Sequence, residues 1–115
     1  MVTEIPDGLI DLDTPAGTLL GFTSARFAGY LWKTSDAITV SFIISKQRGN
    51  FRELADRILS LGYAVKVPTP LGRMAEIVRK AGYRETWEDT ELGSCEVWIK
   101  RPDRGAVKEN AHAIH

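Results

Sequence analysis

Residues 45–67 read SKQRGNFRELADRILSLGYAVKV, and this stretch decides the fold. Apolar residues recur in it at positions i, i+3, i+4, i+7 and i+8, the spacing of an amphipathic helix: Phe51, Leu54, Ala55, Ile58 and Leu59. Gly62 follows where a left-handed C-terminal cap is expected, and residues 63–67 (YAVKV) predict a strand. With a strand before it, this segment is a strand–helix–strand unit, so we predict a right-handed crossover between parallel neighbouring strands.

The strand before the helix is predicted at residues 37–45 (AITVSFIIS). Its apolar residues alternate with a period of two, which is typical of a strand with one buried face. We therefore expect these side chains to share that buried face: Ile38, Val40, Phe42 and Ile44.

The rest of the chain extends this unit at both ends. Residues 1–17 are predicted to be irregular with a short edge strand around residues 8–12, and residues 18–32 to form two short strands or one bulged strand. Thr69 and Pro70 are expected to cap and open a second helix that ends at Gly82. Its buried stripe is predicted to be Leu71, Met74, Ala75, Val78 and Ala81.

Two further strands, at residues 84–90 and 94–100, are expected to form an antiparallel hairpin. The predicted fold class is therefore α/β (α+β), with a mixed central sheet and the order β-β-β-α-β-α-β-β. We expect one domain over residues 1–103 and a polar C-terminal tail over residues 104–115.

Composition limits the classes of function. The chain has 115 residues, of which 43% are hydrophobic and 26% are charged, which fits one domain of ordinary globular composition. Fifteen basic residues balance fifteen acidic ones, and we expect no nucleic-acid partner because nucleic-acid-binding proteins carry a basic excess or stripe. The single cysteine is Cys95 and the histidines are His112 and His115, so we predict no metal site and no imidazole base in the folded body.

The sequence also carries no pattern of export or membrane insertion. The first 13 residues (MVTEIPDGLIDLD) lack the basic and apolar regions of a signal peptide. No apolar stretch reaches the roughly 18 residues that a membrane span needs. We therefore expect no membrane partner and a cytoplasmic location.

A polar elbow, residues 47–50 (QRGN), separates the strand at residues 37–45 from the helix after it. The first backbone amides of a helix lack intrahelical acceptors, and with the helix dipole they form an anion site. Gly49 would let a ligand approach the backbone, and Lys46, Arg48 and Arg52 add positive charge. The same residues also suit a plain strand-to-helix turn, so both interpretations stay open on this pattern alone.

Residues 38–100 resemble the C-terminal half of the GNAT superfamily of N-acetyltransferases. In that family an Arg/Gln-x-x-Gly-x-Gly/Ala loop at a helix N-terminus holds the pyrophosphate of acetyl-CoA, and residues 46–51 (KQRGNF) are similar to it. Residues 67–74 (VPTPLGRM) and 80–86 (KAGYRET) are similar to the family's next strand, the helix after it and the closing "GF-R" pattern.

The resemblance implies a GNAT-like sheet with the N-terminal helices reduced or absent, and an acyl-CoA-binding N-acetyltransferase. The acceptor would be a primary amine on a small molecule or a protein. The cofactor would be acetyl-CoA, with strand amides of residues 43–45 facing the pantetheine arm and residues 48–52 holding the pyrophosphate. The implied cofactor-binding residues are Ile43, Ile44, Ser45, Arg48, Gly49, Asn50, Phe51 and Arg52.

Several positions depart from the family pattern. Phe51 stands where a second small loop residue is expected, and Leu71 and Val78 replace an Asn and a Tyr. That Tyr usually protonates the departing thiolate, which Val cannot do. Residues 37–45 contain no carboxylate that could act as a base. We assign no catalytic residue, and the alternative is an inactive GNAT-fold structural or assembly protein, such as a bacteriophage virion component made in the host cytoplasm.

Two segments are candidates for contacts between copies. An aromatic run, Phe22, Phe27, Tyr30 and Trp32, suits either core packing or a subunit interface. Residues 104–115 are polar, and such an end is ordered when a partner holds it. We therefore predict self-association, or another protein partner, through the aromatic run and the tail.

Overall fold

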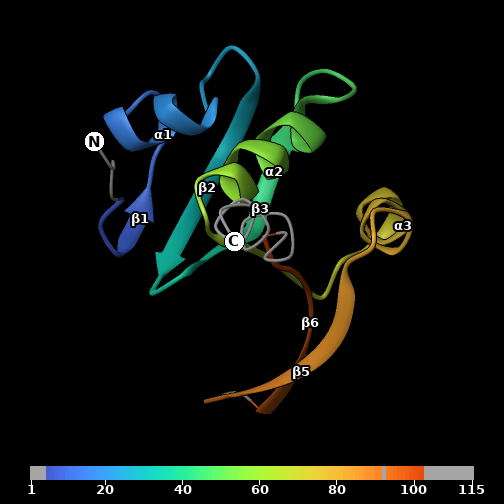
Figure 1. Ribbon diagram of the computed structural model, residues 1–115. Coiled ribbons are helices and arrows are strands. Elements are labelled where there is room, and N and C mark those ends of the chain that lie inside the picture. Colours follow the sequence, from blue (N-terminus) through green and yellow to red (C-terminus); the bar gives the residue numbers. More distant parts are fainter. Residues whose placement is uncertain (1–4, 92, 103–115) are drawn as a thin grey trace, which may run out of the picture.

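The computed structural model describes residues 5–91 and 93–102, which form a mixed α+β fold (Figure 1). Six strands form one sheet in the order β1-β2-β3-β4-β6-β5. Strands β3 and β4 are parallel, as predicted, and the other neighbouring pairs are antiparallel. The elements are β1 (Gly8–Ile10), α1 (Pro15–Leu20), β2 (Phe27–Thr34), β3 (Ala37–Ser45), α2 (Asn50–Ser60), β4 (Ala64–Pro68), α3 (Gly72–Lys80), β5 (Arg84–Thr90) and β6 (Gly93–Lys100).

Helix α1 was not predicted, and the strand structure expected over residues 18–32 is wrong for residues 18–26, because β2 begins only at Phe27. Thr14 caps the helix, because its hydroxyl accepts a hydrogen bond from the Gly17 amide at 3.0 Å. Pro15 occupies the first turn and Gly21, at φ 78°, ends the helix in the left-handed conformation. Local capping thus outweighs the apolar, strand-like composition of this segment, and the N-terminal region keeps one helix of six residues.

The expected N-terminus of α3 is also wrong. Thr69 does not cap a helix: its amide donates to the Glu96 carbonyl of β6 at 2.7 Å, and its φ is 39°. The helix begins two residues after Pro70, at Gly72, with Leu71 as the N-terminal cap residue. The hydrogen bond to β6 therefore holds Thr69 outside the helix, which begins only at Gly72.

The predicted buried stripe of α3 is correct only in part. Val78 is fully buried, and Met74 and Ala75 are half-buried. Leu71 is 77% exposed and Ala81 is also exposed, because both lie just outside the helix, as its N-terminal and C-terminal cap residues.

A β-bulge divides the apolar residues of β3 between the two faces of the sheet. The register with β2 shifts between the pairs Tyr30–Phe42 and Trp32–Thr39. Ile38 and Val40 are buried, but Phe42 and Ile44 are 54% and 56% exposed. The prediction of one buried face for all four is therefore wrong, since one extra residue in a strand reverses the side-chain alternation beyond it.

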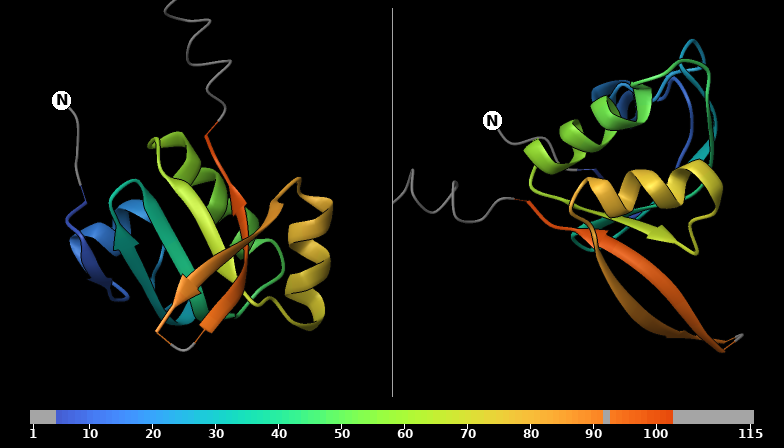
Figure 2. Two further views of the ribbon diagram at one scale, coloured as in Figure 1. Left: turned by 90° about the horizontal axis from the view of Figure 1, so that it is seen from below. Right: turned by 90° about the vertical axis from the view of Figure 1, so that its right-hand side faces the viewer.

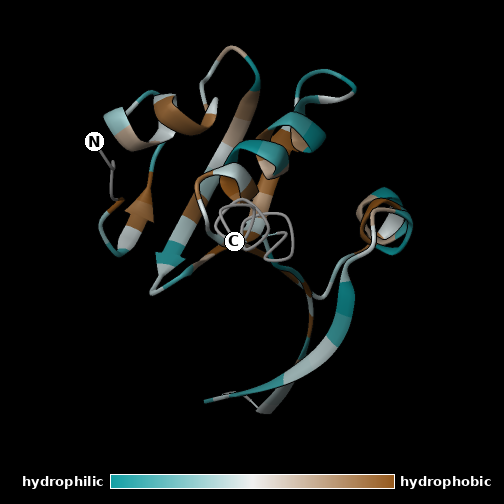
Figure 3. Cartoon of the chain, viewed as in Figure 1, coloured by the Kyte–Doolittle hydropathy of each residue, from teal (hydrophilic) through white to brown (hydrophobic). Residues whose placement is uncertain are grey.

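The core lies between the sheet and its helices. Seen from below, strands β1–β3 lie in front of α1 and α2, so these helices cover the other face (Figure 2). Hydrophilic and hydrophobic residues alternate along α2 and α3, as expected for helices with one buried side (Figure 3). The largest fully buried side chains are Phe22, Phe27, Ile10, Leu20, Leu31, Ile38, Leu54, Ile58, Val65 and Val78.

Strands β3 and β4 are paired over only part of their length. Residues 37–39 of β3 pair with β2 on one side and with residues 64–66 of β4 on the other. Residues 42–45 of β3 pair with β2 alone. The C-terminal halves of the two parallel strands thus separate on the side where each strand leads into a helix. This separation positions the elbow before α2 opposite α3.

Candidate anion-binding groove

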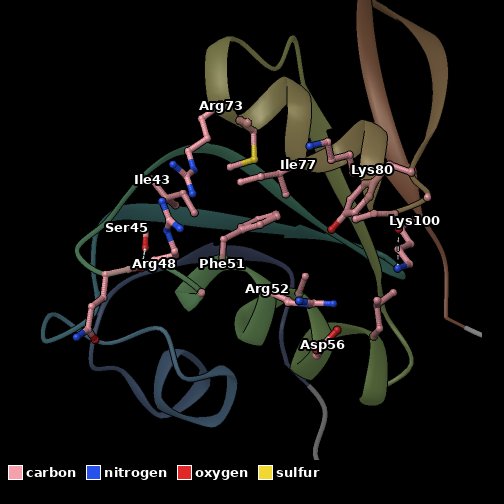
Figure 4. Close-up of a pocket in the computed structure, with 18 of the residues that line it drawn as sticks. Ile43, Ser45, Arg48, Phe51, Arg52, Asp56, Arg73, Ile77, Lys80 and Lys100 are labelled. Atoms are coloured by element: carbon pink, nitrogen blue, oxygen red, sulfur yellow. Dashed lines mark hydrogen bonds between the residues drawn. The ribbon is translucent and has the colours of Figure 1, made fainter.

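A groove of about 1120 Å³ lies between α2 and α3 (Figure 4). Its walls come from the end of β3, the elbow, both helices and residues 81–83 between α3 and β5, and Lys100 of β6 adds to the far end. Pockets for small ligands commonly measure about 300–1,000 Å³. The groove is therefore large enough for an extended ligand.

The elbow end of the groove presents the N-terminus of α2. Gly49 has φ 92°, and a Cβ atom at this position would meet no atom within 4 Å. No side chain caps the helix, and the Asn50 amide donates to the Gln47 carbonyl at 3.3 Å. The amides of Phe51 and Arg52 have no hydrogen-bond acceptor within residues 5–91 and 93–102. This end of α2 thus offers free donors at the positive end of the helix dipole.

Positive charge is concentrated along the groove although the whole chain is neutral. Six basic side chains line it against a single carboxylate, that of Asp56. The six are Lys46, Arg48, Arg52, Arg73, Lys80 and Lys100. An anion in the groove would therefore gain from both the side chains and the amides of α2.

Most of these cations are available to a ligand. The Lys46 and Lys100 ammonium groups donate to backbone carbonyls, of Ser24 at 2.7 Å and of Ala81 at 2.8 Å. The other four form no ion pair with any described residue: Arg48, Arg52, Arg73 and Lys80. In Figure 4 the side chains of Arg48 and Arg73 extend toward each other from the elbow and from α3.

The carboxylate in the first turn of α2 is directed away from the groove. Glu53 pairs with Arg26 at 2.8 Å and with Arg57 at 3.7 Å. The hydrogen bond and the charge of Arg26 hold the pKa of Glu53 below its ordinary range. Glu53 is thus charged at neutral pH but bound to arginines that do not line the groove.

The floor of the groove is apolar. It is formed by Ile43 of β3, Phe51 and Leu59 of α2, and Met74 and Ile77 of α3. Phe51 is 6% exposed and packs in the core, so its ring lies beneath the elbow rather than above the helix amides. The groove therefore combines a cationic rim with an apolar base, which suits a ligand with anionic and apolar parts.

Six of the eight implied cofactor-binding residues line this groove: Ile43, Ser45, Arg48, Gly49, Phe51 and Arg52. The other two point elsewhere. Ile44 is exposed on the opposite face of the sheet, and the buried Asn50 side chain donates to the Arg26 carbonyl at 3.0 Å. Asn50 thus fastens the elbow to the chain before β2 and does not face a ligand.

The α3 side of the groove was missed in the sequence. Its polar members, Arg73 and Lys80, lie seven positions apart with Ile77 between them, so all three lie on one helical face. The sequence contains this i, i+4, i+7 pattern. It is hard to recognise there, because the apolar residues of the same helix predict a stripe that faces the core. The position of α3 beside α2, which gives the pattern its meaning, depends on long-range packing.

A buried hydroxyl lies at the far end of the groove. Tyr83 is 6% exposed, and its hydroxyl has no hydrogen-bond partner in the part of the chain that the structure describes. Burial, with a smaller contribution from the charge of Asp56, raises the pKa of Tyr83 far above its ordinary value near 10. The Lys100 ammonium lies 5.8 Å from the centre of the ring. Tyr83 is therefore a neutral hydrogen-bond donor at neutral pH.

This environment predicts an alkaline loss of stability. In the unfolded chain Tyr83 deprotonates near pH 10, whereas in the folded protein it stays protonated, so the free energy of unfolding falls as pH rises above about 10. Tyr83→Phe is expected to remove this part of the loss and to be neutral or up to about 1 kcal/mol more stable at pH 7, because the unpaired hydroxyl disappears. Urea unfolding at pH 7 and pH 10.5 measures both. A phenylalanine variant less stable by more than about 1 kcal/mol at pH 7 would show that the hydroxyl has a partner.

Within the described ranges, no group of three or more His, Cys, Asp or Glu side chains is arranged to hold a metal ion. None of the described helices is long and apolar enough to cross a membrane. The predicted tail at residues 104–115, including both histidines, lies outside the described residues.

Comparisons with family models, with curated proteins and with solved structures found no match to this chain.

Proposed function

We propose that the groove binds acyl-CoA and that the protein is a GNAT-like N-acetyltransferase acting on a primary amine. The observation that carries the proposal is a groove with six basic side chains that begins at the uncapped N-terminus of α2, where β3 and β4 separate. The sequence resemblance at residues 46–51 supports the same ligand. The sheet order, with one parallel pair followed by an antiparallel hairpin, is compatible with a GNAT-like arrangement.

The residues present fit the parts of this ligand. The free amides of Phe51 and Arg52, with the Arg48 and Arg73 side chains, would hold the pyrophosphate. The apolar floor at Ile43 and Met74 would contact the pantetheine arm. The remaining cations, near Lys80, would attract the other anionic part of the cofactor.

The chemistry would depend mainly on placement. In acyl transfer the amine nitrogen forms a bond to the thioester carbon, the carbon–sulfur bond breaks, and the proton lost by the nitrogen ends on the departing thiolate, which leaves as the free thiol. Holding the two reactants in line contributes most of such an acceleration, and no acid is indispensable. Val78 is fully buried and does not line the groove, so it contributes nothing to proton transfer. Tyr83 is the only described tyrosine that lines the groove, and its neutral hydroxyl can donate a hydrogen bond.

Titration with acetyl-CoA by calorimetry tests the binding. The wild type is expected to bind, and Arg48→Ala is expected to bind about tenfold more weakly, because a hydrogen bond to a charged group contributes about 1.5–3 kcal/mol. Arg79→Ala removes an exposed arginine of α3 that does not line the groove and is expected to leave the affinity unchanged. No heat at millimolar acetyl-CoA would contradict the proposal.

Gly49 provides a second, matched test. Gly49→Asn and Gly49→Asp have nearly the same shape and meet the same open space and the same φ of 92°. Only Asp adds a negative charge beside the helix amides, so Asp is expected to lose at least about tenfold more affinity than Asn. Equal affinities for the two variants would show that the ligand binds away from the elbow.

A protein of this fold without catalysis is the second candidate. It is favoured by the buried Val78 in place of an acid and by the exposed apolar side chains on the helix-free face of β1–β3. Release of free CoA thiol from acetyl-CoA, measured with a panel of primary amines, separates the two. Binding without amine-dependent thiol release would favour a structural or assembly role, such as that of a virion component.

A further inference from the structure

The face of strands β1–β3 that lies opposite the helices carries an uncovered apolar patch. Among the described residues, eight large hydrophobic side chains are exposed, and five of them lie on these three strands. We call these five the open face: Leu9, Tyr30, Trp32, Phe42 and Ile44. Their exposed fractions lie between 40% and 56%. In Figure 2 these strands are seen with no helix in front of them.

The strand register makes the open face continuous. Leu9 pairs with Trp32 across β1 and β2, and Tyr30 pairs with Phe42 across β2 and β3. The rings of Tyr30 and Phe42 are in contact, with centroids 6.0 Å apart. Ile44 pairs with Ala28. Because directly paired residues share a face, the five side chains form one surface with Trp32 on its middle strand.

This surface is uncharged. The register pairs that carry it contain no Asp, Glu, Lys or Arg: Leu9–Trp32, Ala28–Ile44, Tyr30–Phe42, Trp32–Thr39 and Thr34–Ala37. The nearest charge toward β4 is Lys66, whose ammonium is paired with Glu88 at 2.7 Å. A nucleic acid, an anionic membrane or a charged peptide would find no complementary charge here. The occupant that this chemistry suits is an equally uncharged apolar face.

Each copy of the chain carries such a face. The five side chains, each about half exposed, present on the order of 500 Å² of surface, near the upper limit for a patch on a monomer. A standard interface buries roughly 800 Å² per partner, so the open face alone supplies more than half of that area, and the exposed Thr34 beside it adds to it. The net charge of zero means that two copies do not repel each other. Aromatic side chains at the centre of such a surface contribute most to association.

We propose that the open face is the interface of a homodimer, in which two copies pack strands β1–β3 face to face about a two-fold axis with Trp32 near its centre. Sheets pack in this way with their strands about 30° apart. The groove lies on the other side of the sheet, as the neighbouring residues Ile43 and Ile44 show: Ile43 lines the groove and Ile44 belongs to the open face. Dimerisation therefore leaves the groove accessible and is independent of its function.

Light scattering coupled to gel filtration tests this interface. The wild type at about 100 µM is expected to have twice the chain mass of 12.8 kDa. Trp32→Arg is expected to raise the dimer dissociation constant at least about a hundredfold, because a charge then lies in the centre of the interface. Trp87→Arg is the matched control: Trp87 is 63% exposed on β5, outside the open face, and the variant is expected to remain dimeric.

Other outcomes would overturn the proposal. A wild type that is monomeric at 100 µM contradicts it, and if deletion of residues 103–115 then produces dimers, that segment covers the open face instead. Loss of the dimer in Trp87→Arg but not in Trp32→Arg would place the interface on the hairpin. If Trp32→Arg does not fold, Ile44→Lys replaces it, because the Ile44 side chain is 56% exposed and contributes little to the monomer core. A dimeric Ile44→Lys variant with unchanged affinity would also overturn the proposal.

Discussion

The double variant Arg48→Glu/Arg73→Glu is expected to bind acetyl-CoA at least about a hundredfold more weakly than the wild type, because two charge-assisted contacts become repulsive. The two arginines reach into the groove from different elements, the elbow and α3, and their side chains extend toward each other (Figure 4). Neither forms an ion pair with a described residue, so both guanidinium groups remain available to an anionic ligand. Calorimetric titration measures the loss.

The matched control is Arg48→Glu/Arg79→Glu, which changes the net charge of the protein by the same amount. Arg79 is exposed on α3 but does not line the groove, so this variant should retain more affinity than the first. Equal losses would mean that the net charge, rather than the groove, attracts the ligand. Thermal unfolding without ligand should show the first variant about as stable as the wild type, since neither replaced arginine forms an ion pair with a described residue that the substitution would break.

Gly29→Ala is expected to destabilise the fold by at least about 3 kcal/mol and to lower the melting temperature by more than about 10 °C. Gly29 lies in β2 opposite Ile43, with φ 115°. An added Cβ would lie 2.2 Å from the Phe42 carbonyl oxygen and 2.9 Å from the Ile43 Cα, and both atoms belong to the backbone. Strand β3 would have to move at the point where it lines the groove.

Gly8→Ala separates this clash from backbone strain. Gly8 lies in β1 with φ 119°, almost the same conformation, and a Cβ there would meet no atom within 4 Å. Its melting temperature should therefore fall by much less than that of Gly29→Ala, as measured by circular dichroism. Equal decreases in melting temperature would show that the positive φ, and not the close approach of β3, is the reason that Gly29 cannot be replaced by alanine.

Local sequence patterns predicted most of the elements and the elbow side of the groove, but not its α3 side. The helix at residues 50–60 was visible because its apolar spacing, its glycine elbow and the following strand agree with one another. Local patterns failed at two identical dipeptides, Thr14-Pro15 and Thr69-Pro70. The first begins a helix that was not predicted, and the second does not begin the helix that was predicted there. Thr14 caps α1, whereas Thr69 is bound to Glu96, which lies 27 positions further along the chain. A capping pattern depends on neighbouring residues, whereas the strand that binds Thr69 comes from a distant part of the chain.

The aromatic run shows the same limit of local sequence patterns. Its members are unevenly spaced along the chain, and no local pattern distinguishes Phe22 and Phe27, which are buried, from Tyr30 and Trp32, which are exposed. The helices on one side of the sheet decide which ring is covered. The bulge in β3 places Phe42 and Ile44 on the exposed face of the sheet. It too arises from long-range structure, because it depends on the pairing of β3 with β2.

The one-dimensional pattern of residues 45–67 suffices to specify a strand–helix–strand unit and a polar elbow that can receive an anion, because periodicity and turn chemistry act over a few residues. Whether that elbow opens onto a charged groove depends on residues that are distant from it in the sequence. The separation of β3 from β4 and the placement of Arg73 and Lys80 opposite Arg48 and Arg52 arise from sheet pairing and helix packing. Charges that cancel along the sequence do not cancel in space, and only the folded arrangement gathers six of them around one groove.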